Sequence, residues 1–419
     1  MKFIGYRRLV IAVLILLSTS LAQAAPEKTI YSFAAAAPLD SDGMEPYSQP
    51  VFDAKGNLFA TTLTGGTHNA GIIFELSPSK NAEWVETILY EFTGGTDGGN
   101  PFAGLVFDHE GNLYGTASIG GVNGTGVVFE LSPTASGWTY KVLYSFGAYP
   151  SSGDGFAPNS PIVFDKLNNI YGTTNEGGGA GCFEGCGTVF ELSPTGTGEW
   201  KEQVIHRFTP NGKDGEVPSG GVTFGTNGNL YGTTPNGGTA GSGVLYQLKY
   251  SSTTRSWSES IIHQFVGGKG AGSFPTNVIL ISDSTGNLYG TTDGGGEHDF
   301  GTVFEAAYSS TTGWTTKVLY SFNATYSGDG NSPHAGVTMD KQGNLYGTTS
   351  YGGEYNYYGT VFKLSKGDTG EWTETTLHSF TGGADGFYPE AGVTIHDGLL
   401  YGTAMLGGND SGVVFQSSE

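Results

Sequence analysis

Two short segments of the chain bring together side chains that could carry out acid–base chemistry. Glu297, His298 and Asp299 are consecutive, and Glu176 precedes a second glutamate, Glu184, by a few residues. Two carboxyl groups, or a carboxylate with an imidazole, can exchange protons with a polysaccharide substrate in a hydrolase or a lyase. Charged groups in solvated loops produce the same pattern, and we expect this second explanation to hold at both positions.

The most distinctive candidate binding segment spans residues 351–358 and reads Y-G-G-E-Y-N-Y-Y. Aromatic faces stack on sugar rings, and a carboxylate can hold the sugar hydroxyls. Glu354, Tyr355, Tyr357 and Tyr358 therefore form a candidate glycan-binding group. The alternative is that these rings pack against neighbouring loops and serve only the structure.

Aspartate followed by glycine recurs in six loops, at Asp42, Asp97, Asp154, Asp214, Asp329 and Asp385. Hard cations such as Ca²⁺ bind carboxylate and carbonyl oxygens, and Asp40 with Asp42 comes nearest to a calcium-binding loop. No segment has the full D-x-[DN]-x-[DN]-G-x₅-E pattern. Aspartate also caps turns, and glycine supplies the positive φ that many turns need. We therefore expect turns and no cofactor, with calcium as the alternative.

The only two cysteines are Cys182 and Cys186, in the run C-F-E-G-C. In an oxidising compartment a local disulfide is the first expectation, and two free thiols are the alternative. A zinc site here would need two further ligands, and no paired histidine motif lies nearby.

The chain contains seven copies of one repeat of about 57 residues. The structure of this repeat must position the candidate side chains named above. Each copy carries a run like G-N-L-Y-G-T-T, whose aromatic residue is Phe59, Tyr114, Tyr171, Tyr231, Tyr289, Tyr346 or Tyr401. A glycine pair and a G-T-V-F-like run follow. Six copies then have one tryptophan each, at Trp84, Trp138, Trp200, Trp257, Trp314 and Trp372, and these are all the tryptophans of the chain.

Each repeat contains four strand-like runs, which in the second full repeat are 103–108, 112–118, 126–131 and 138–146. They are short, rich in β-branched and aromatic residues, and bounded by Gly, Pro, Asn and Ser. No part of the chain after residue 24 shows sustained 3.6-residue periodicity, so helices should be scarce. Four short antiparallel strands per repeat are typical of a propeller blade. The sequence therefore predicts an all-β fold, a seven-bladed β-propeller with four-stranded antiparallel blades, whose strands we call a to d from the inside outward.

The two ends of the chain predict how the ring closes. Residues 29–33 read as a strand d with no blade before it, and residues 412–415 read as a strand c with no strand d after it. If the N-terminal strand completes the last blade, no unpaired edge remains between the first and last blades. We therefore expect one domain, residues 25–419, formed by a closed ring.

Antiparallel blades send their d–a and b–c loops to one face of the ring and their a–b and c–d loops to the other. The a–b turns, as at 108–112, read as plain hairpin turns. The b–c loops vary most between repeats, so we expect the ligand on the b–c/d–a face, by analogy with other propellers. Acidic or histidine groups that break the repeat and converge at the channel mouth would indicate an enzyme, whereas aromatic groups alone would indicate a binding protein.

Three histidines, His206, His263 and His378, occupy a strand-d position where other repeats have tyrosine. We interpret them as packing or hydrogen-bonding substitutions. We expect no metal site built from them, because this position faces outward in separate blades. The sequence has no H-E-x-x-H, G-x-S-x-G, P-loop or dinucleotide motif.

The pattern G-N-L-Y-G-T-T…G-G…G-T-V-F-E-L-S-P resembles the tandem GloVer repeat (Gloeobacter–Verrucomicrobia type) of exported bacterial proteins. The resemblance covers about residues 28–419. It implies export and a repeat structure, and it carries over no catalytic residue. Proteins of that family often have a C-terminal sorting anchor, and this sequence is expected to lack one because it stops at Glu419.

Residues 1–24 read as a cleavable export signal. Lys2, Arg7 and Arg8 form a basic start, residues 9–17 are apolar but short for a membrane span, and Ala22 and Ala24 suit a cleavage site before residue 25. We therefore expect a secreted or periplasmic protein with no membrane insertion after cleavage. Removing the three cations takes the net charge from −21 to about −24. Such a charge repels phosphate backbones and disfavours nucleic acid as a partner.

These observations favour an exported binding module whose ligand is a glycan or another surface molecule. The alternatives are a polysaccharide hydrolase or lyase that uses the b–c/d–a face, and a structural or adhesive protein of the cell surface. The expected oligomeric state is a monomer.

Overall fold

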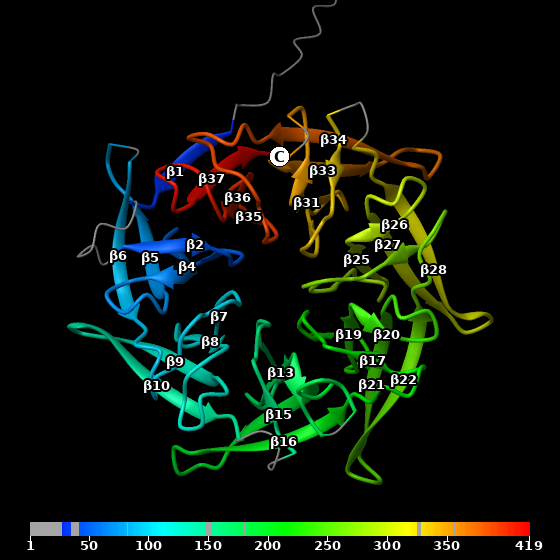
Figure 1. Ribbon diagram of the computed structural model, residues 1–419, viewed down its shortest axis with the longest axis horizontal. Helices are drawn as coiled ribbons and strands as arrows, with labels where there is room; N and C mark the ends of the chain where they lie inside the picture. Colours follow the sequence, from blue (N-terminus) through cyan, green and yellow to red (C-terminus); the bar gives the residue numbers. More distant parts are fainter. Residues whose placement is uncertain are drawn as a thin grey trace, which may run out of the picture.

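The computed structural model describes residues 27–34, 42–81, 83–147, 153–179, 181–324, 328–355 and 357–419. The described chain is all β, with seven main sheets arranged in a ring around one axis (Figure 1). This confirms the predicted seven-bladed propeller. The expected signal, residues 1–24, lies outside the described residues. Among the described residues, no helix is long and apolar enough to cross a bilayer.

The blades follow one another along the chain, and each runs from strand a at the axis to strand d at the rim. Blade 1 contains β2 (Gly43–Pro46), β3 (Val51–Phe52), β4 (Leu58–Gly65), β5 (Ile72–Pro78) and β6 (Trp84–Glu91). Blade 2 contains β7 (Val106–Phe107), β8 (Leu113–Ala117), β9 (Val127–Thr134) and β10 (Gly137–Ser145). Blade 3 contains β11 (Gly155–Phe156), β12 (Val163–Phe164), β13 (Ile170–Thr174), β14 (Glu176–Gly177), β15 (Thr188–Pro194) and β16 (Trp200–Arg207).

The next three blades repeat the pattern of blade 3. Blade 4 contains β17 (Gly215–Glu216), β18 (Thr223–Phe224), β19 (Leu230–Thr234), β20 (Asn236–Gly237), β21 (Val244–Ser251) and β22 (Ser256–Gln264). Blade 5 contains β23 (Gly272–Ser273), β24 (Ile281–Ser282), β25 (Leu288–Thr292), β26 (Gly294–Gly295), β27 (Thr302–Ser309) and β28 (Gly313–Ser321). Blade 6 contains β29 (Gly330–Asn331), β30 (Thr338–Met339), β31 (Leu345–Thr349), β32 (Tyr351–Gly352), β33 (Thr360–Lys366) and β34 (Trp372–Ser379).

Blade 7 joins the two ends of the chain. It contains β35 (Thr394–His396), β36 (Leu399–Ala404), β37 (Val413–Ser418) and β1 (Lys28–Ser32), and these strands form one sheet in the order β1-β37-β36-β35 (Figure 1). Lys28 pairs with Gln416 and Ser32 with Val413, and the ladder has a bulge between Thr29 and Tyr31. The other c–d ladders have the same irregularity. The ring is therefore closed as the sequence predicts, by the N-terminal strand.

The innermost strand is interrupted in most blades. In blade 3, β11 pairs with β14 and β12 pairs with β13, and Asn159 and Pro161 of the irregular segment between β11 and β12 line a small cavity shared by all seven blades. Pro158, Asn159 and Ser160 lie in this segment. The interruption frees these residues from the ladder, so the segment can present side chains that differ from blade to blade.

The apolar core lies between the blades. Seven clusters of buried residues each combine side chains from two neighbouring blades, because a single sheet has two apolar faces and cannot cover either alone. In the cluster between blades 7 and 1, Ile30 and Val414 pack with Leu58, Ile72 and Phe74. Within a blade, glycine on strand b leaves room for the ring on strand c, since a Cβ added at Gly172 would lie 2.6 Å from the ring of its cross-strand partner Phe190.

The a–b turns are built by the aspartate of the D-x-x-G-N run. In blade 2, Asp108 accepts hydrogen bonds from the backbone N–H groups of Glu110 and Asn112, and Tyr114 donates its hydroxyl proton to the same carboxylate at 3.3 Å. The tyrosine hydroxyl thereby ties strand b to the turn. Blade 4 is different, because Gly225 stands where the turns in blades 1, 2, 3, 5 and 6 have aspartate.

Candidate functional site

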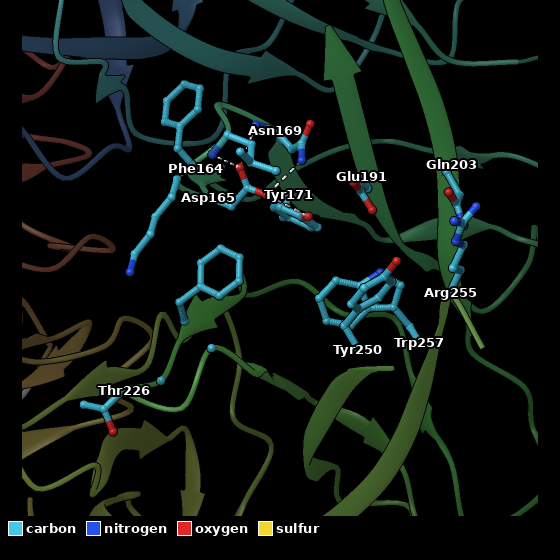
Figure 2. A pocket seen from close by; sticks show the side chains of 15 residues that line it. Phe164, Asp165, Asn169, Tyr171, Glu191, Gln203, Thr226, Tyr250, Arg255 and Trp257 are labelled. Carbon is cyan, nitrogen blue, oxygen red and sulfur yellow. Dashed lines mark hydrogen bonds between the residues drawn. The ribbon is translucent and has the colours of Figure 1, made fainter. Parts of the chain in front are cut away.

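A groove of about 910 Å³ lies between blades 3 and 4, at the face where the a–b and c–d loops emerge. Figure 2 shows its walls. Phe164 and Tyr171 come from blade 3, whereas Tyr250 and Trp257 come from strands c and d of blade 4. A cavity of this volume lies in the range of small-molecule binding sites.

The aromatic wall of this groove comes from two neighbouring strands. Tyr250 on β21 and Trp257 on β22 are cross-strand partners, and their ring centroids lie 5.3 Å apart. The Trp257 ring also meets the edge of Tyr171 from blade 3, with centroids 5.8 Å apart. Tyr250 is 47% exposed, which is high for a large aromatic side chain. The pair therefore presents aromatic surface to the groove, and packing of Trp257 against Tyr171 holds it in place.

Polar groups line the rest of the groove, and those of the a–b turn are already engaged. Asp165 accepts hydrogen bonds from the side-chain amide of Asn169 and from the hydroxyl of Tyr171. Burial, together with Glu191 and Asp165, raises the pKa of Tyr171, so its phenol stays protonated and acts as a donor. The exposed side chains of Lys166, Gln203 and Arg255 also line the groove.

A second groove, of about 500 Å³, lies next to the first, between blades 4 and 5. Its aromatic wall is the equivalent pair Tyr308 and Trp314, with ring centroids 5.5 Å apart, and Tyr308 is 62% exposed. Gly225 and Thr226, in the a–b turn of blade 4, line both grooves. This turn is therefore a shared wall between the two grooves.

The a–b turn of blade 4 carries no carboxylate at the position that aspartate fills in other blades. The hydroxyl of Tyr231 instead accepts hydrogen bonds from the side-chain amides of Asn227, at 2.8 Å, and Gln247, at 2.9 Å. Neutral amides and Lys249 therefore line the second groove, in a chain whose net charge is −21. This local loss of negative charge reduces the electrostatic repulsion of an acidic ligand.

A different polar group forms on the opposite face, at the mouth of the central channel. His334, which follows the d–a loop of blade 6, lies between two carboxylates: Nδ1 is 2.5 Å from Glu390 of blade 7, and Nε2 is 3.0 Å from Asp293 of blade 5. Burial alone would lower the pKa of His334, but the two carboxylates raise it to about 10. The imidazole is therefore a cation at neutral pH, and the His334 cation in turn lowers the pKa of Asp293 against the effect of burial.

Side chains fill most of the channel at this level. The hydroxyl of Tyr47 in blade 1 donates to Glu390 at 3.4 Å and accepts from Asn277 of blade 5 at 3.5 Å. The remaining cavity on the axis is about 50 Å³, lined by residues of all seven blades. That volume holds a few water molecules and is too small for a sugar ring. Because both nitrogens of His334 are engaged, we interpret this group as a polar connection between blades and not as a free general base.

The comparison with protein families identifies the repeat. A model of the Gloeobacter/Verrucomicrobia repeat matches residues 20–209 and again residues 179–415. The chain belongs to the Gloeobacter/Verrucomicrobia repeat family. This confirms the resemblance drawn from the sequence. No curated protein matches the chain.

Solved structures with a similar fold share little sequence with this member of the Gloeobacter/Verrucomicrobia repeat family. A hypothetical selenium-binding protein from Sulfolobus tokodaii is 10% identical, with a TM-score of 0.50 over 84% of this chain and 79% of its own. A 6-phosphogluconolactonase candidate from Bacteroides uniformis is 13% identical, with a TM-score of 0.49 over 82% of this chain and 86% of its own. Trypanosoma rangeli sialidase is 11% identical, with a TM-score of 0.42 over 82% of this chain and 57% of its own. At such identities the likeness concerns the fold alone.

The aromatic b–c loop of blade 6 does not form one stacking surface. Tyr355 and Tyr357 are 50% and 69% exposed, whereas Tyr358 is half-buried and packs on Phe387, with ring centroids 5.6 Å apart. The backbone N–H of Glu354 donates to the Ser379 hydroxyl, and its side chain is exposed. Two of the four candidate residues are thus available to a ligand as rings, and one serves the packing.

The candidate acid–base residues lie between strands b and c of blades 3 and 5. Glu297, His298 and Asp299 are all exposed, and Asp299 accepts a hydrogen bond from the backbone N–H of Gly295, as a turn-capping residue does. Burial raises the pKa of Glu176, and the nearby Glu184 raises it further. Neither segment contributes the carboxylates that contact His334.

The Asp-Gly loops use their carboxylates for backbone hydrogen bonds. Asp42 accepts from the N–H groups of Ala34 and Gly43, at 2.7 and 2.8 Å, and Asp40 lies outside the described residues. The expected reason for the glycine is wrong in four of the six loops. Only Gly98 and Gly386 have positive φ, whereas the glycines after Asp42, Asp154, Asp214 and Asp329 pack directly against a threonine of strand b. There the glycine is needed because a Cβ has no room.

Cys182 and Cys186 form a disulfide in the b–c loop of blade 3. Cys186 is buried in the cluster between blades 3 and 4, and the half-buried Cys182 packs against it. The bridge therefore anchors this long loop to the core.

The three strand-d histidines do not meet one another, but each meets polar groups near the next blade. His263 shares a hydrogen bond with Thr316 at 3.0 Å, and His378 with Asp385 at 3.1 Å. His206 lies between Asp214 and Glu259.

Sequence reasoning did not find the two grooves or the His334 group. Tyr250 and Tyr308 stand where the first three repeats have proline, in S-P before the tryptophan, so they are visible as departures from the repeat. His334 and Glu390 likewise follow a proline that every repeat has, at a position where the residue type changes from blade to blade. The signal in both cases is variation at a fixed repeat position.

Proposed function

We propose that this protein is a binding module for polysaccharide and that the ligand occupies the two neighbouring grooves at the a–b/c–d face. The observation that carries the proposal is the pair of exposed Tyr250 and half-buried Trp257 in a groove of about 910 Å³ that also has amide and guanidinium groups. Aromatic faces pack on the C–H faces of sugar rings, and planar polar side chains hold the hydroxyl groups. This proposal keeps the glycan expected from the sequence and moves it from the b–c/d–a face to the opposite one.

A chain-like ligand suits the arrangement better than a single sugar. The Tyr250–Trp257 and Tyr308–Trp314 pairs come from the same strand positions in successive blades, and the turn at Gly225 and Thr226 connects their grooves. Once one part of a polysaccharide is bound in one groove, the chain holds its next part close to the other groove. A polysaccharide that fills both grooves therefore binds with higher affinity than a ligand that fills one. We therefore expect affinity to rise with oligosaccharide length.

The binding test uses the chain from residue 25 onward and a panel of neutral and acidic polysaccharides with matched oligosaccharides. Tyr250→Ala, Tyr308→Ala and the double variant remove the exposed rings. They should fold, because Lys366 occupies the same position in blade 6. We expect each single variant to weaken binding of the long chains about 10-fold, and the double variant to abolish the length dependence.

The matched control is Tyr355→Ala with Tyr357→Ala, which removes two exposed rings from the opposite face. Retention that is unchanged by this control and lost in the Tyr250 and Tyr308 variants supports the grooves. The reverse result contradicts the proposal and returns the ligand to the b–c loop of blade 6.

The same incubations test the competing enzyme hypothesis. New reducing ends or unsaturated products that disappear in Glu390→Gln would place chemistry at the channel mouth and contradict a role limited to binding. The convergence of Asp293, His334 and Glu390 is the observation that favours this alternative. The engaged state of both His334 nitrogens and the small cavity are the observations against it.

We also propose that the protein acts outside the cytoplasm, in the periplasm or beyond the cell, as a monomer. The export-type residues 1–24 and the Cys182–Cys186 disulfide support this proposal. N-terminal sequencing of the protein from a cell envelope or culture fraction tests it, and an intact Met1 in the cytoplasmic fraction would contradict it.

A further inference from the structure

Most blade interfaces have a polar group at the same place near the rim. A tyrosine or histidine late in strand d lies near the aspartate of the following d–a loop and near strand d of the next blade. The tyrosine versions are ordinary hydrogen-bonded groups. Tyr31 donates to Glu86 at 2.8 Å, and Tyr144 and Tyr320 each donate to the aspartate of their loop at 2.8 Å.

His206, between blades 3 and 4, does not fit this pattern. Its Nε2 lies 3.6 Å from Asp214 Oδ1 and 3.5 Å from Glu259 Oε1. Both distances exceed the usual N–H···O range of about 2.7–3.2 Å. The Nε2 atom of His206 and the Oε1 atom of Glu259 are buried and have no hydrogen-bond partner among the described residues. An unpartnered buried polar atom costs about 1–3 kcal/mol, so two of them at one position call for an explanation.

The two distances from His206 Nε2 to the carboxylate oxygens suit ligands around one ion. A tetrahedral ion bonded to nitrogen and oxygen at about 2.0–2.2 Å holds those atoms about 3.3–3.6 Å apart. His206, Asp214 and Glu259 each offer one ligand atom, and all three atoms lie within 4.8 Å of one another. Their side chains are 16%, 7% and 18% exposed, so the group lies just beneath the surface, with the Nε2 atom of His206 and the Oε1 atom of Glu259 themselves buried.

We propose that His206, Asp214 and Glu259 bind a divalent transition-metal ion of the Zn²⁺ class between blades 3 and 4. One imidazole and two carboxylates suit a borderline ion, whereas Ca²⁺ and Mg²⁺ prefer an all-oxygen set. Water completes the coordination on the solvent side. The ion ties strand β16 of blade 3 to strand β22 of blade 4.

A second group, Glu27, His378 and Asp385, provides an internal control between blades 6 and 7. There the imidazole makes a direct hydrogen bond to Asp385 at 3.1 Å, and Glu27 is 4.0 Å away. Its imidazole nitrogen has a carboxylate partner at hydrogen-bond distance, whereas the Nε2 atom of His206 has none among the described residues. Although the Oε1 atom of Glu27 is also buried without a partner, we therefore expect this group to bind no zinc.

The test uses tag-free protein, stripped with a chelator and then mixed with ZnCl₂. His206→Tyr recreates the tyrosine that stands at this repeat position at Tyr31, Tyr90, Tyr144 and Tyr320, so the variant is expected to fold. His378→Tyr is the matched control. We expect about one zinc per chain after gel filtration in wild type and in His378→Tyr, and none in His206→Tyr.

Thermal unfolding gives the second readout. Zn²⁺ at 100 µM should raise the Tm of wild type by about 2 °C or more, because a ligand of the native state stabilises it, and should leave His206→Tyr unchanged. Glu259→Gln should also lose the shift, which keeps the test decisive if the tyrosine variant is unstable. Equal zinc uptake by wild type and His206→Tyr, no uptake by wild type, or an equal Tm rise with Ca²⁺ would each overturn the assignment.

Discussion

Single residues that depart from the repeat account for what is individual about this protein. Tyr250 and Tyr308 create exposed aromatic surface, Gly225 and Gln247 remove negative charge between them, and His206 replaces a tyrosine. Each change is small because the blade supplies the backbone. A repeat fold therefore acquires a site by substituting side chains at positions that the framework already holds in place.

The charge of His334 has a measurable effect on stability. The pKa of His334, about 10, lies above the value of about 6.5 expected in the unfolded chain. The stability that its charge contributes is therefore fully present below pH 6.5 and is lost as the pH rises through 10. His334→Gln leaves Glu390 and Asp293 without their cation, and we expect it to reduce the free energy of unfolding by about 2–4 kcal/mol at pH 7.

Urea unfolding at several pH values checks this prediction. The difference between wild type and His334→Gln should shrink between pH 7 and pH 10, because wild type loses the same charge by titration. A difference that stays constant across this range would mean that the imidazole contributes packing and not charge. His109→Gln is the control, since His109 is exposed.

At the scale of strands, strand d of one blade buries a carboxyl group near the aspartate of the d–a loop that follows strand d of the preceding blade. Burial raises the pKa of Glu202 and of Glu374 to about 7, and the nearby Asp154 and Asp329, respectively, raise it further. A folded-state pKa above the unfolded value means that the folded chain binds the extra proton. The contribution of these two glutamates to the free energy of unfolding is therefore most favourable below about pH 4.5, and it is lost as the pH rises through 7.

We expect glutamine at these positions to remove part of that pH dependence. Glu202→Gln and Glu374→Gln resemble the protonated acids, so each should be more stable than wild type at pH 8, by up to about 1–2 kcal/mol after allowance for solvent screening. The gain, measured by thermal unfolding, should disappear at pH 4.5. Glu110→Gln, at an exposed turn position, should have no effect at either pH. A loss of stability at pH 8 would show that the carboxylates hold essential ionic contacts.

The elements of this fold could be predicted from the sequence because each repeat shows the same pattern independently. Alternation, turn residues and the run around Tyr114 or Tyr171 recur in register, so seven weak signals support one assignment. Pro158 and Pro161 mark an irregular segment around Asn159, but the short pairing of β11 with β14 before it could not be predicted, because a two-residue strand carries no periodicity. The reason for the glycine of the Asp-Gly loops was equally hidden, because it is a contact with a threonine of the next strand in the blade.

The sites were less accessible because they form between blades. Asp293, His334 and Glu390 come from three successive repeats, and His206 meets Glu259 of the following repeat. A local pattern contains no information on such pairs until the ring is assembled. The loop candidates around Glu297 and Glu354 are prominent in the sequence because their polar residues are adjacent, and both glutamates are exposed in the structure.

At the scale of the whole molecule, stability rests on the closure of the ring. β1 supplies one edge of blade 7 and contributes Ile30 to the cluster between blades 7 and 1, where Phe33 also packs. A chain without Glu27–Ala34 would expose the edge of β37 and part of that cluster. We expect such a chain to lose cooperative unfolding and to aggregate, because an open edge pairs with other chains.

Comparison of two truncated chains checks this expectation. One starts at residue 25 and the other at residue 35, and both are followed by gel filtration and thermal unfolding. A monomeric, cooperatively unfolding product from the shorter chain would contradict the role given to β1. Adding a synthetic peptide of residues 25–34 should restore part of the Tm if the strand alone supplies the closure.

The pairing of β1 with β37 also has a consequence for how such genes change. The seam, where β1 pairs with β37, lies one strand away from the boundary between repeats. These two strands, the seam partners, therefore lie outside the interior copies of the repeat. Unequal recombination that duplicates or deletes one interior copy leaves both partners intact. A lineage can therefore try six or eight copies without first evolving a new way to join its ends, and selection then acts only on whether the wedge angle of each copy fits the new number.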